Sequence, residues 1–171
     1  MGKLEIVTAS ALEVKCMSEI CRGSFGKYYP DFEDWYHSKV LPGIGSSRWL
    51  LKAILNERLA GICIVKNDGI EKKICSLRVD VHHRGRGVGS ALVEASIELL
   101  EERRPVITVP QEVVQHMRPL LAKFDFEETG KCPDFYRKGS SEFFFNGSPT
   151  FRKCASEHRI EDQKIIGAAT R

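Results

Sequence analysis

Apolar residues follow two different spacings along the chain, and these spacings predict a mixture of strands and helices. Alternation of apolar and polar positions predicts strands over residues 3–8, 49–55, 59–65, 73–79, 106–109, 126–131 and 142–145. Helical spacing predicts helices over residues 10–21, 32–40 and 112–124, and a long helix that begins at residue 88. Ser10 is expected to cap the first helix, and Pro105 to stop the long one.

The order of these elements predicts the fold class. The three strands between residues 49 and 79 form an antiparallel meander, whose second turn is Asn67-Asp68-Gly69. The long helix leads from the meander to the strand at 106–109, and such a crossover implies parallel pairing. We therefore expect one α/β domain over residues 1–146, with a mixed (α+β), mostly antiparallel sheet of six or seven strands and about four flanking helices. Residues 147–171 are polar and are expected to form a C-terminal extension.

Composition narrows the picture only modestly. Apolar residues make up 42% of the chain and charged residues 29%, which is typical of a folded globular protein, and a net charge of +3 does not indicate nucleic acid. No segment approaches the ~20 apolar residues of a membrane span, and no signal peptide is recognisable, so we expect no membrane association and a cytoplasmic location. The six cysteines form no C-x-x-C pair, which favours reduced thiols and no metal.

The turn over residues 84–89, R-G-R-G-V-G, is the strongest chemical signal. It follows an apolar strand and opens the long helix, where unpaired backbone N–H groups and the helix dipole favour an anion. The glycines at 85, 87 and 89 let a ligand approach the main chain, and two arginines add charge. Neither the Walker pattern nor the dinucleotide fingerprint matches.

This turn resembles the [RQ]-x-x-G-x-[GA] signature of the GNAT superfamily of acyl-CoA-dependent N-acyltransferases, and the preceding L-R-V-D-V is similar to that family's strand end. The resemblance implies a sheet that splays between the fourth and fifth strands. It also implies direct transfer of an acetyl group from acetyl-CoA to an amine. The residues that it implies for acetyl-CoA binding are Leu77, Arg78, Val79, Arg84, Gly85, Arg86, Gly87, Val88, Gly89 and Ser90.

The catalytic residues of the family are not recognisable here. Leu121 stands where many members have a tyrosine that protonates the departing CoA, and Val114 stands where they have an asparagine. Lys73 and Cys75 occupy the strand that carries a glutamate or histidine base in other members. His116 and Glu57 are candidate substitutes. His116 is, however, better explained as an ordinary, partly buried helix residue, and Glu57 is also explained as a turn residue that faces solvent. The catalytic residues therefore stay open.

An aromatic and acidic segment lies where GNAT proteins build the acceptor pocket. Aromatic rings and carboxylates suit a cationic amine, but the same residues can simply pack a short helix. The acceptor is left open among a small molecule, a protein and an aminoacyl-tRNA, bound by a monomer or homodimer. The alternative is a catalytically silent acyl-CoA-binding or sensing module that docks a partner. The candidate acceptor residues are Tyr28, Tyr29, Asp31, Glu33 and Trp35.

Overall fold

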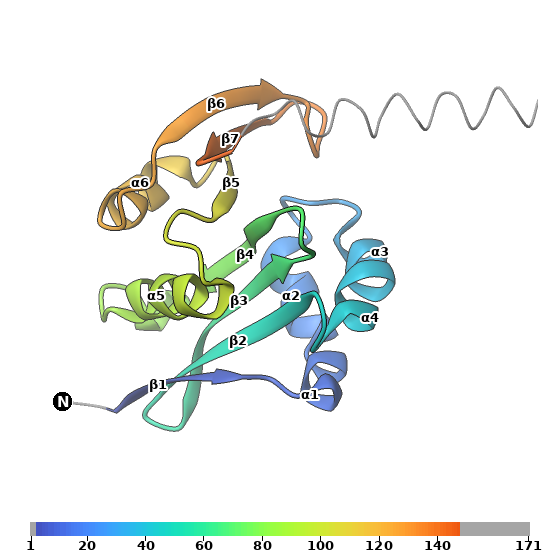
Figure 1. The fold of residues 1–171 in the computed structure, drawn as a ribbon, viewed down its shortest axis with the longest axis vertical. Coiled ribbons are helices and arrows are strands. Elements are labelled where there is room, and N and C mark those ends of the chain that lie inside the picture. Colours follow the sequence, from blue (N-terminus) through green and yellow to red (C-terminus); the bar gives the residue numbers. More distant parts are fainter. Residues whose placement is uncertain (1–2, 148–171) are drawn as a thin grey trace, which may run out of the picture.

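A computed structural model describes residues 3–147, which build one seven-stranded sheet in the order β1-β2-β3-β4-β5-β7-β6 (Figure 1). Every neighbouring pair is antiparallel except β4 and β5, which are parallel. The predicted mixed, mostly antiparallel sheet is thus confirmed. The strands are β1 Leu4–Thr8, β2 Arg48–Leu55, β3 Arg58–Asn67, β4 Lys72–Val79, β5 Val106–Pro110, β6 Glu128–Pro133 and β7 Ser141–Phe145.

Helices cover both faces of the sheet, because strand side chains alternate between the faces and each face carries its own buried cluster. Figure 1 shows α1–α4 on one face of β2–β4 and α5 on the other, with α6 beside β5–β7. The α-helices are α1 Ala11–Cys16, α2 Ser18–Phe25, α3 Phe32–Trp35, α4 Leu41–Gly43, α5 Val88–Leu100 and α6 Val114–Ala122, and two short turns are the π-helical η1 Tyr36–Val40 and the 3-10 η2 Val81–His83.

The first predicted helix is wrong in its extent. Ser10 caps it as expected, in a capping box with Glu13, but the helix breaks at Met17, where ψ is 0°. Met17 is 8% exposed and packs into the cluster under α1–α4. Burial of this side chain outweighs the local helix preference, so two helices form, and the second continues to Phe25, past the predicted end at residue 21.

The predicted strand at 126–131 starts two residues too early. After α6 ends at Ala122, Asp125 adopts the left-handed region with φ 56°, and the Phe126 N–H donates to the Leu121 carbonyl at 3.1 Å. Helices commonly close in this way, so Phe126 lies in the turn that follows α6, and the strand begins only at Glu128. The predicted helix at 112–124 is correspondingly shorter, and the one at 32–40 continues through η1 into α4.

The sheet splays between β4 and β5. Only two residue pairs join these strands, Lys73 with Val106 and Ile74 with Ile107. Ile74 and Ser76 pair with successive residues of β3, so Cys75 lies in a bulge, which bends the strand at this point. The implied splay is therefore present, and β4 beyond Ile74 does not pair with β5.

The sequence also led to expectations about thiols, metal sites and membrane-spanning helices. Five cysteines of the described region carry free thiols, while Cys154 and residues 148–171 of the expected extension lie outside the described residues. In residues 3–147 no cluster of three or more histidine, cysteine or acidic side chains is arranged to hold a metal ion. No helix of that same region is both long and apolar enough to cross a membrane.

Candidate functional site

The glycine-rich turn leads directly into α5. Asp80 caps η2, with its carboxylate accepting from the His82 N–H and contacting His83 Nδ1, both at 3.0 Å. Gly85 and Gly87 then adopt φ values of 71° and 80°, a region that side chains rarely enter. A Cβ atom at either glycine would meet no atom of the described chain within 4 Å. The turn thus presents bare backbone to open space at the start of a 13-residue helix.

Packing holds this turn against the sheet. Val88 is 1% exposed and lies in the core cluster below α5. Gly89 approaches α6, where a Cβ atom would come within 3.2 Å of Leu120 Cδ2. Arg84 and Arg86 are exposed on the outer side, and Ser90 is half-buried. The chain therefore has what an anion site needs at a helix start: fixed, uncovered amides with cations beside them.

The end of β4 lies next to this turn. Leu77 and Val79 are half-buried against the core cluster, while the Arg78 guanidinium donates to the Ser24 carbonyl of α2 at 2.9 Å. The Arg78 side chain therefore fastens α2 to the sheet. The main chain of these three residues lies beyond the last β4–β5 pair, so one edge of it is available to an extended ligand.

A buried polar cluster, which we call the Glu142 cluster, lies where the sheet splays, and the sequence analysis missed it. Glu142 of β7 is only 4% exposed, and the Tyr29 hydroxyl donates to its Oε1 at 3.1 Å. Burial raises the pKa of Glu142 to about 7, while the hydrogen bonds from Tyr29 and Thr108 and the Lys73 charge oppose that rise. Lys73 of β4 is 5% exposed and donates to the Tyr136 hydroxyl at 3.4 Å.

The cluster connects the two halves of the sheet. Tyr29 belongs to the loop between α2 and α3, which packs on β2–β4, whereas Glu142 and Tyr136 belong to the half formed by β5, β6 and β7. The rings of Tyr29 and Tyr136 meet edge to face at 5.2 Å. Arg137 adds a second link by donating to the Lys27 carbonyl at 2.8 Å. These contacts fix the distance between the halves on the face opposite α5.

A signal for this cluster did exist in the sequence. Glu142 is the charged residue of the otherwise uncharged strand S-E-F-F-F, in which three phenylalanines follow it. A carboxylate at an inward position of such a strand indicates a special role. Its partner Tyr29 lies 113 positions away, however, and no local pattern connects the two.

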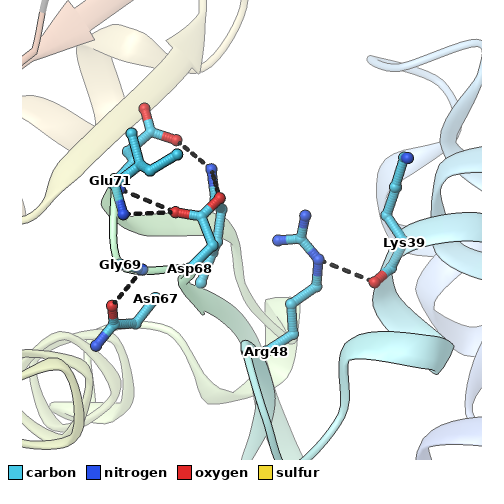
Figure 2. A network of polar contacts seen from close by, with 8 residues as sticks. Lys39, Arg48, Asn67, Asp68, Gly69 and Glu71 are labelled. Atoms are coloured by element: carbon cyan, nitrogen blue, oxygen red, sulfur yellow. Dashed lines mark hydrogen bonds and ion pairs between the residues drawn. The ribbon is translucent and has the colours of Figure 1, made fainter.

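A second polar network braces the start of β4 (Figure 2). Asp68 accepts from the Ile70 and Glu71 N–H groups and thereby shapes the β3–β4 turn. Lys66 Nζ pairs with Asp68 at 2.7 Å and with Glu71 at 2.9 Å. Figure 2 shows Arg48 between this turn and Lys39, whose carbonyl accepts from Arg48 Nε at 3.0 Å. The network fixes the strand end that carries Lys73.

The candidate acceptor residues do not form one wall. Tyr29 joins the Glu142 cluster, but Trp35 packs on Phe32 with Arg48 over its ring at 5.8 Å. Tyr28 lies under Lys27, and Asp31 is exposed at the start of α3. Glu33 points toward Arg22 at 3.9 Å, over a hollow of about 180 Å³ lined by Ser18, Glu19, Arg22, Phe32, Glu33, Tyr36 and His37.

The substitute catalytic residues lie elsewhere. His116 is exposed on α6, and Glu57 is exposed in the β2–β3 turn with φ 63°. Leu121 and Val114 are 0% and 2% exposed in the core, and it is Leu120 that approaches the glycine-rich turn. Loss of solvent raises the pKa of the Cys75 thiol, which keeps it protonated and makes it a poor nucleophile.

Comparisons with solved structures agree with this architecture. The ribosomal-protein-S18-alanine N-acetyltransferase from Escherichia coli superimposes with a TM-score of 0.66 at 17% identity, over 84% of this chain and 92% of its own. NAA60 from Arabidopsis thaliana in complex with acetyl-CoA gives 0.61 at 15% identity, over 84% and 97%. The spermidine/spermine N-acetyltransferase SpeG from Vibrio cholerae gives 0.60 at 13% identity, over 84% and 93%. At these identities the likeness shows the fold.

Sequence comparison identifies the family. A search of curated proteins finds no significant match to this chain. The sequence model of the acetyltransferase (GNAT) family matches residues 15–126, which run from α1 past the glycine-rich turn to the segment between α6 and β6. On this match, and with a splayed sheet of the same architecture, the chain belongs to the GNAT acetyltransferase family.

Proposed function

We propose that the protein is an N-acetyltransferase that moves the acetyl group of acetyl-CoA directly to a primary amine. The observation that carries this proposal is the pair of left-handed glycines, Gly85 and Gly87, which open onto free space at the start of α5 beside the unpaired end of β4. The uncovered amides suit the diphosphate of CoA, and Arg84 and Arg86 add positive charge.

The end of β4 is suited to bind the pantetheine arm of acetyl-CoA. Its free main-chain edge at residues 77–79 is suited to hydrogen-bond the amide groups of the pantetheine arm, as a further strand would. The thioester then lies in the splay between β4 and β5. There the amine attacks the acetyl carbonyl, backbone N–H groups stabilise the oxyanion, and CoA leaves as the thiol. No covalent enzyme intermediate is required.

The acceptor stays open at the level of chemical class. Among proteins of this fold, one is named for the alanine of a ribosomal protein and another for spermidine and spermine. A small molecule, a protein amine and an aminoacyl-tRNA all remain candidates, with a cytoplasmic monomer or homodimer as the working state.

The alternative is an acyl-CoA-binding or sensing module without turnover. Leu121 and Val114 favour it, because both are buried apolar residues at positions where many family members carry polar catalytic groups. Release of free thiol from acetyl-CoA in the presence of amines separates the two functions. A silent module would bind acetyl-CoA but release no thiol from it.

The glycine-rich turn is tested by Gly87→Glu with Gly69→Glu as a matched control. Both glycines have φ 80° and no atom within 4 Å of a Cβ, but Gly69 lies in the β3–β4 turn. Both variants therefore carry a similar backbone cost, on the order of 1–2 kcal/mol of stability. Only Gly87→Glu places a carboxylate against the phosphates, so only it should abolish binding in a calorimetric titration with acetyl-CoA.

Two results would contradict the proposal. A folded Gly87→Glu protein that binds acetyl-CoA as tightly as Gly69→Glu does would exclude the turn as the phosphate site. Wild-type protein without affinity for acetyl-CoA, or for any other acyl-CoA, would exclude the co-substrate. Circular dichroism of each variant confirms that the fold is intact.

A further inference from the structure

We propose that Glu142 is the catalytic proton acceptor of the reaction: its carboxylate takes a proton from the ammonium form of the acceptor, which frees the amine to attack the acetyl carbonyl. This inference rests on the proposed acetyl transfer and adds the group that makes the amine nucleophilic. It replaces His116 and Glu57, which are exposed on α6 and in the β2–β3 turn.

The position of Glu142 follows from strand alternation. Phe143 and Phe145 pack with the core cluster below α5, so Glu142 points to the opposite face of β7. On β5, Ile107 and Val109 belong to that same core cluster, so Thr108 points to the face of Glu142. The carboxylate therefore lies across the splay from β4, where it contacts Tyr29 of the α2–α3 loop. Figure 1 shows that α1–α4 cover β2–β4 on that side of the sheet.

Burial makes a purely structural role costly for this carboxylate. Glu142 is 4% exposed, and among the ion pairs of residues 3–147 none involves it. An ionised carboxylate without an ion-pair partner destabilises a fold, and such groups concentrate at functional sites. With a pKa of about 7, Glu142 can both accept and release a proton near neutral pH.

Glu142, and not its neighbour Tyr29, is the group that changes charge near neutral pH. Tyr29 stays a neutral donor, because burial and the nearby Glu142 charge raise its pKa well above the usual value. Its hydroxyl orients the carboxylate and favours the ionised form, as does the Lys73 charge, whereas the Glu112 charge opposes ionisation. The titratable or polar groups that surround Glu142 are Tyr29, Lys73, Thr108, Glu112, Cys132 and Tyr136.

Glu142 takes one of the two protons that the ammonium nitrogen loses. The ammonium R–NH₃⁺ gives one proton to Glu142 and becomes R–NH₂, whose electron pair forms the new C–N bond to the acetyl carbon. The C–S bond then breaks, and the thiolate takes up the second proton that the nitrogen loses. Glu142 finally releases its proton to solvent. The products are the acetamide, CoA thiol and one free proton.

The first test compares Glu142→Gln with Glu98→Gln, an exposed glutamate of α5. The amine probes are spermidine and a short peptide with an N-terminal alanine, and the readouts are thiol release and calorimetric acetyl-CoA binding. Glu142→Gln should lower kcat/KM at pH 7 by on the order of 10²–10⁴ while the Kd for acetyl-CoA stays within twofold. Glu98→Gln should change neither.

The pH dependence separates a base from a structural residue. In wild type the rate should fall below about pH 7, as the Glu142 carboxylate takes up a proton. The Glu142→Gln rate should instead follow the fraction of amine that is already neutral, which falls about tenfold per pH unit below the pKa of the amine. With the peptide its deficit should shrink above about pH 8, where the α-amine is already neutral. Tyr29→Phe should move the wild-type fall in rate to higher pH, because the lost hydrogen bond favours the carboxylate.

Four outcomes overturn the inference. A Glu142→Gln rate within threefold of wild type, or a deficit equal at every pH, excludes the proton acceptor while leaving acetyl transfer intact. If the rate of Tyr29→Phe falls at the same pH as that of wild type, the carboxylate that Tyr29 contacts is not the proton acceptor. This test holds even if Glu142→Gln fails to fold. Wild-type protein that binds acetyl-CoA but releases no thiol with either amine contradicts the proposed transfer, and the inference with it.

Discussion

At the scale of single residues, two arginines near the glycine-rich turn have different tasks. Arg84 is exposed beside the uncovered amides, whereas the Arg78 guanidinium donates to the Ser24 carbonyl. Arg84→Ala should weaken acetyl-CoA binding by roughly 10- to 100-fold, the value of a charged hydrogen bond. Arg78→Ala should instead lower the free energy of unfolding by about 1–3 kcal/mol with a nearly unchanged Kd. Calorimetry measures the effect on binding, and urea unfolding measures the effect on stability. If Arg78→Ala weakens binding and Arg84→Ala lowers stability, the roles of the two arginines are reversed.

Single residues could be assigned to a site from the sequence only where the members of the site are neighbours in the chain. The turn at residues 84–89 was recognisable, because the glycines, the arginines and the helix start are adjacent in sequence. The Glu142 cluster was not, since Glu142 and Tyr29 come from segments that only the folded sheet brings together. Local pattern also placed Tyr29 and Glu33 in one group, although the structure directs Glu33 toward Arg22.

At the scale of elements, the β2–β3 hairpin gives a stability prediction. Asn56 and Glu57 both have positive φ, 51° and 63°, as a type I′ turn requires. Glu57→Gly should raise the free energy of unfolding by roughly 0.5–1 kcal/mol, because the relief of left-handed strain exceeds the added entropy of the unfolded chain. Glu57→Ala retains the strain and should show no such gain in urea unfolding. Equal stability of the two variants would contradict this, and a loss of thiol release in both would restore Glu57 as a catalytic candidate.

Element order was predictable because the spacing of apolar residues records which face is buried. The strands of the meander were found within two residues of their observed ends. The long helix begins at residue 88 as predicted, but it ends at Leu100, where Glu101 is left-handed, and not at the expected stop, Pro105. The errors occur where tertiary contacts decide, at Met17 and at Asp125. Met17 lies at the break in the first helix with its side chain buried, and Asp125 follows α6 in a left-handed conformation that spacing does not reveal. The bulge at Cys75 is likewise a property of the pairing with β3.

At the scale of the whole molecule, the last described residues hold three strand ends together. Asn146 accepts from the Glu127 N–H at 3.0 Å and donates to the Pro105 carbonyl at 3.2 Å, so it fastens the end of β7 to the starts of β5 and β6. We expect a chain ended after Gly147 to fold and bind acetyl-CoA like the full chain. A chain ended after Ser140 loses β7 and should not fold. Thermal unfolding with calorimetry tests both, and weaker acetyl-CoA binding by the chain ended after Gly147 would assign a role to residues 148–171.

Stability and the proposed chemistry oppose each other at Glu142. Its pKa of about 7 in the folded protein exceeds the value of about 4.5 for a free glutamate, so the folded state binds more protons between these pH values. The free energy of unfolding should therefore fall as pH rises from 4.5 to 7, by on the order of 3 kcal/mol from this group.

Glu142→Gln isolates this contribution, because the amide resembles the protonated acid at every pH. Its stability should equal that of wild type below pH 4.5 and exceed it by about 3 kcal/mol above pH 7. Asp68, whose pKa is lowered to about 2, and the other surface carboxylates titrate in both proteins, so their effects cancel in the difference. Urea unfolding of both proteins at pH 5 and pH 8 measures it. A difference that is the same at both pH values would mean that Glu142 ionises normally, whereas a gain in stability at pH 8 with lost turnover would show a carboxylate kept at the expense of the fold.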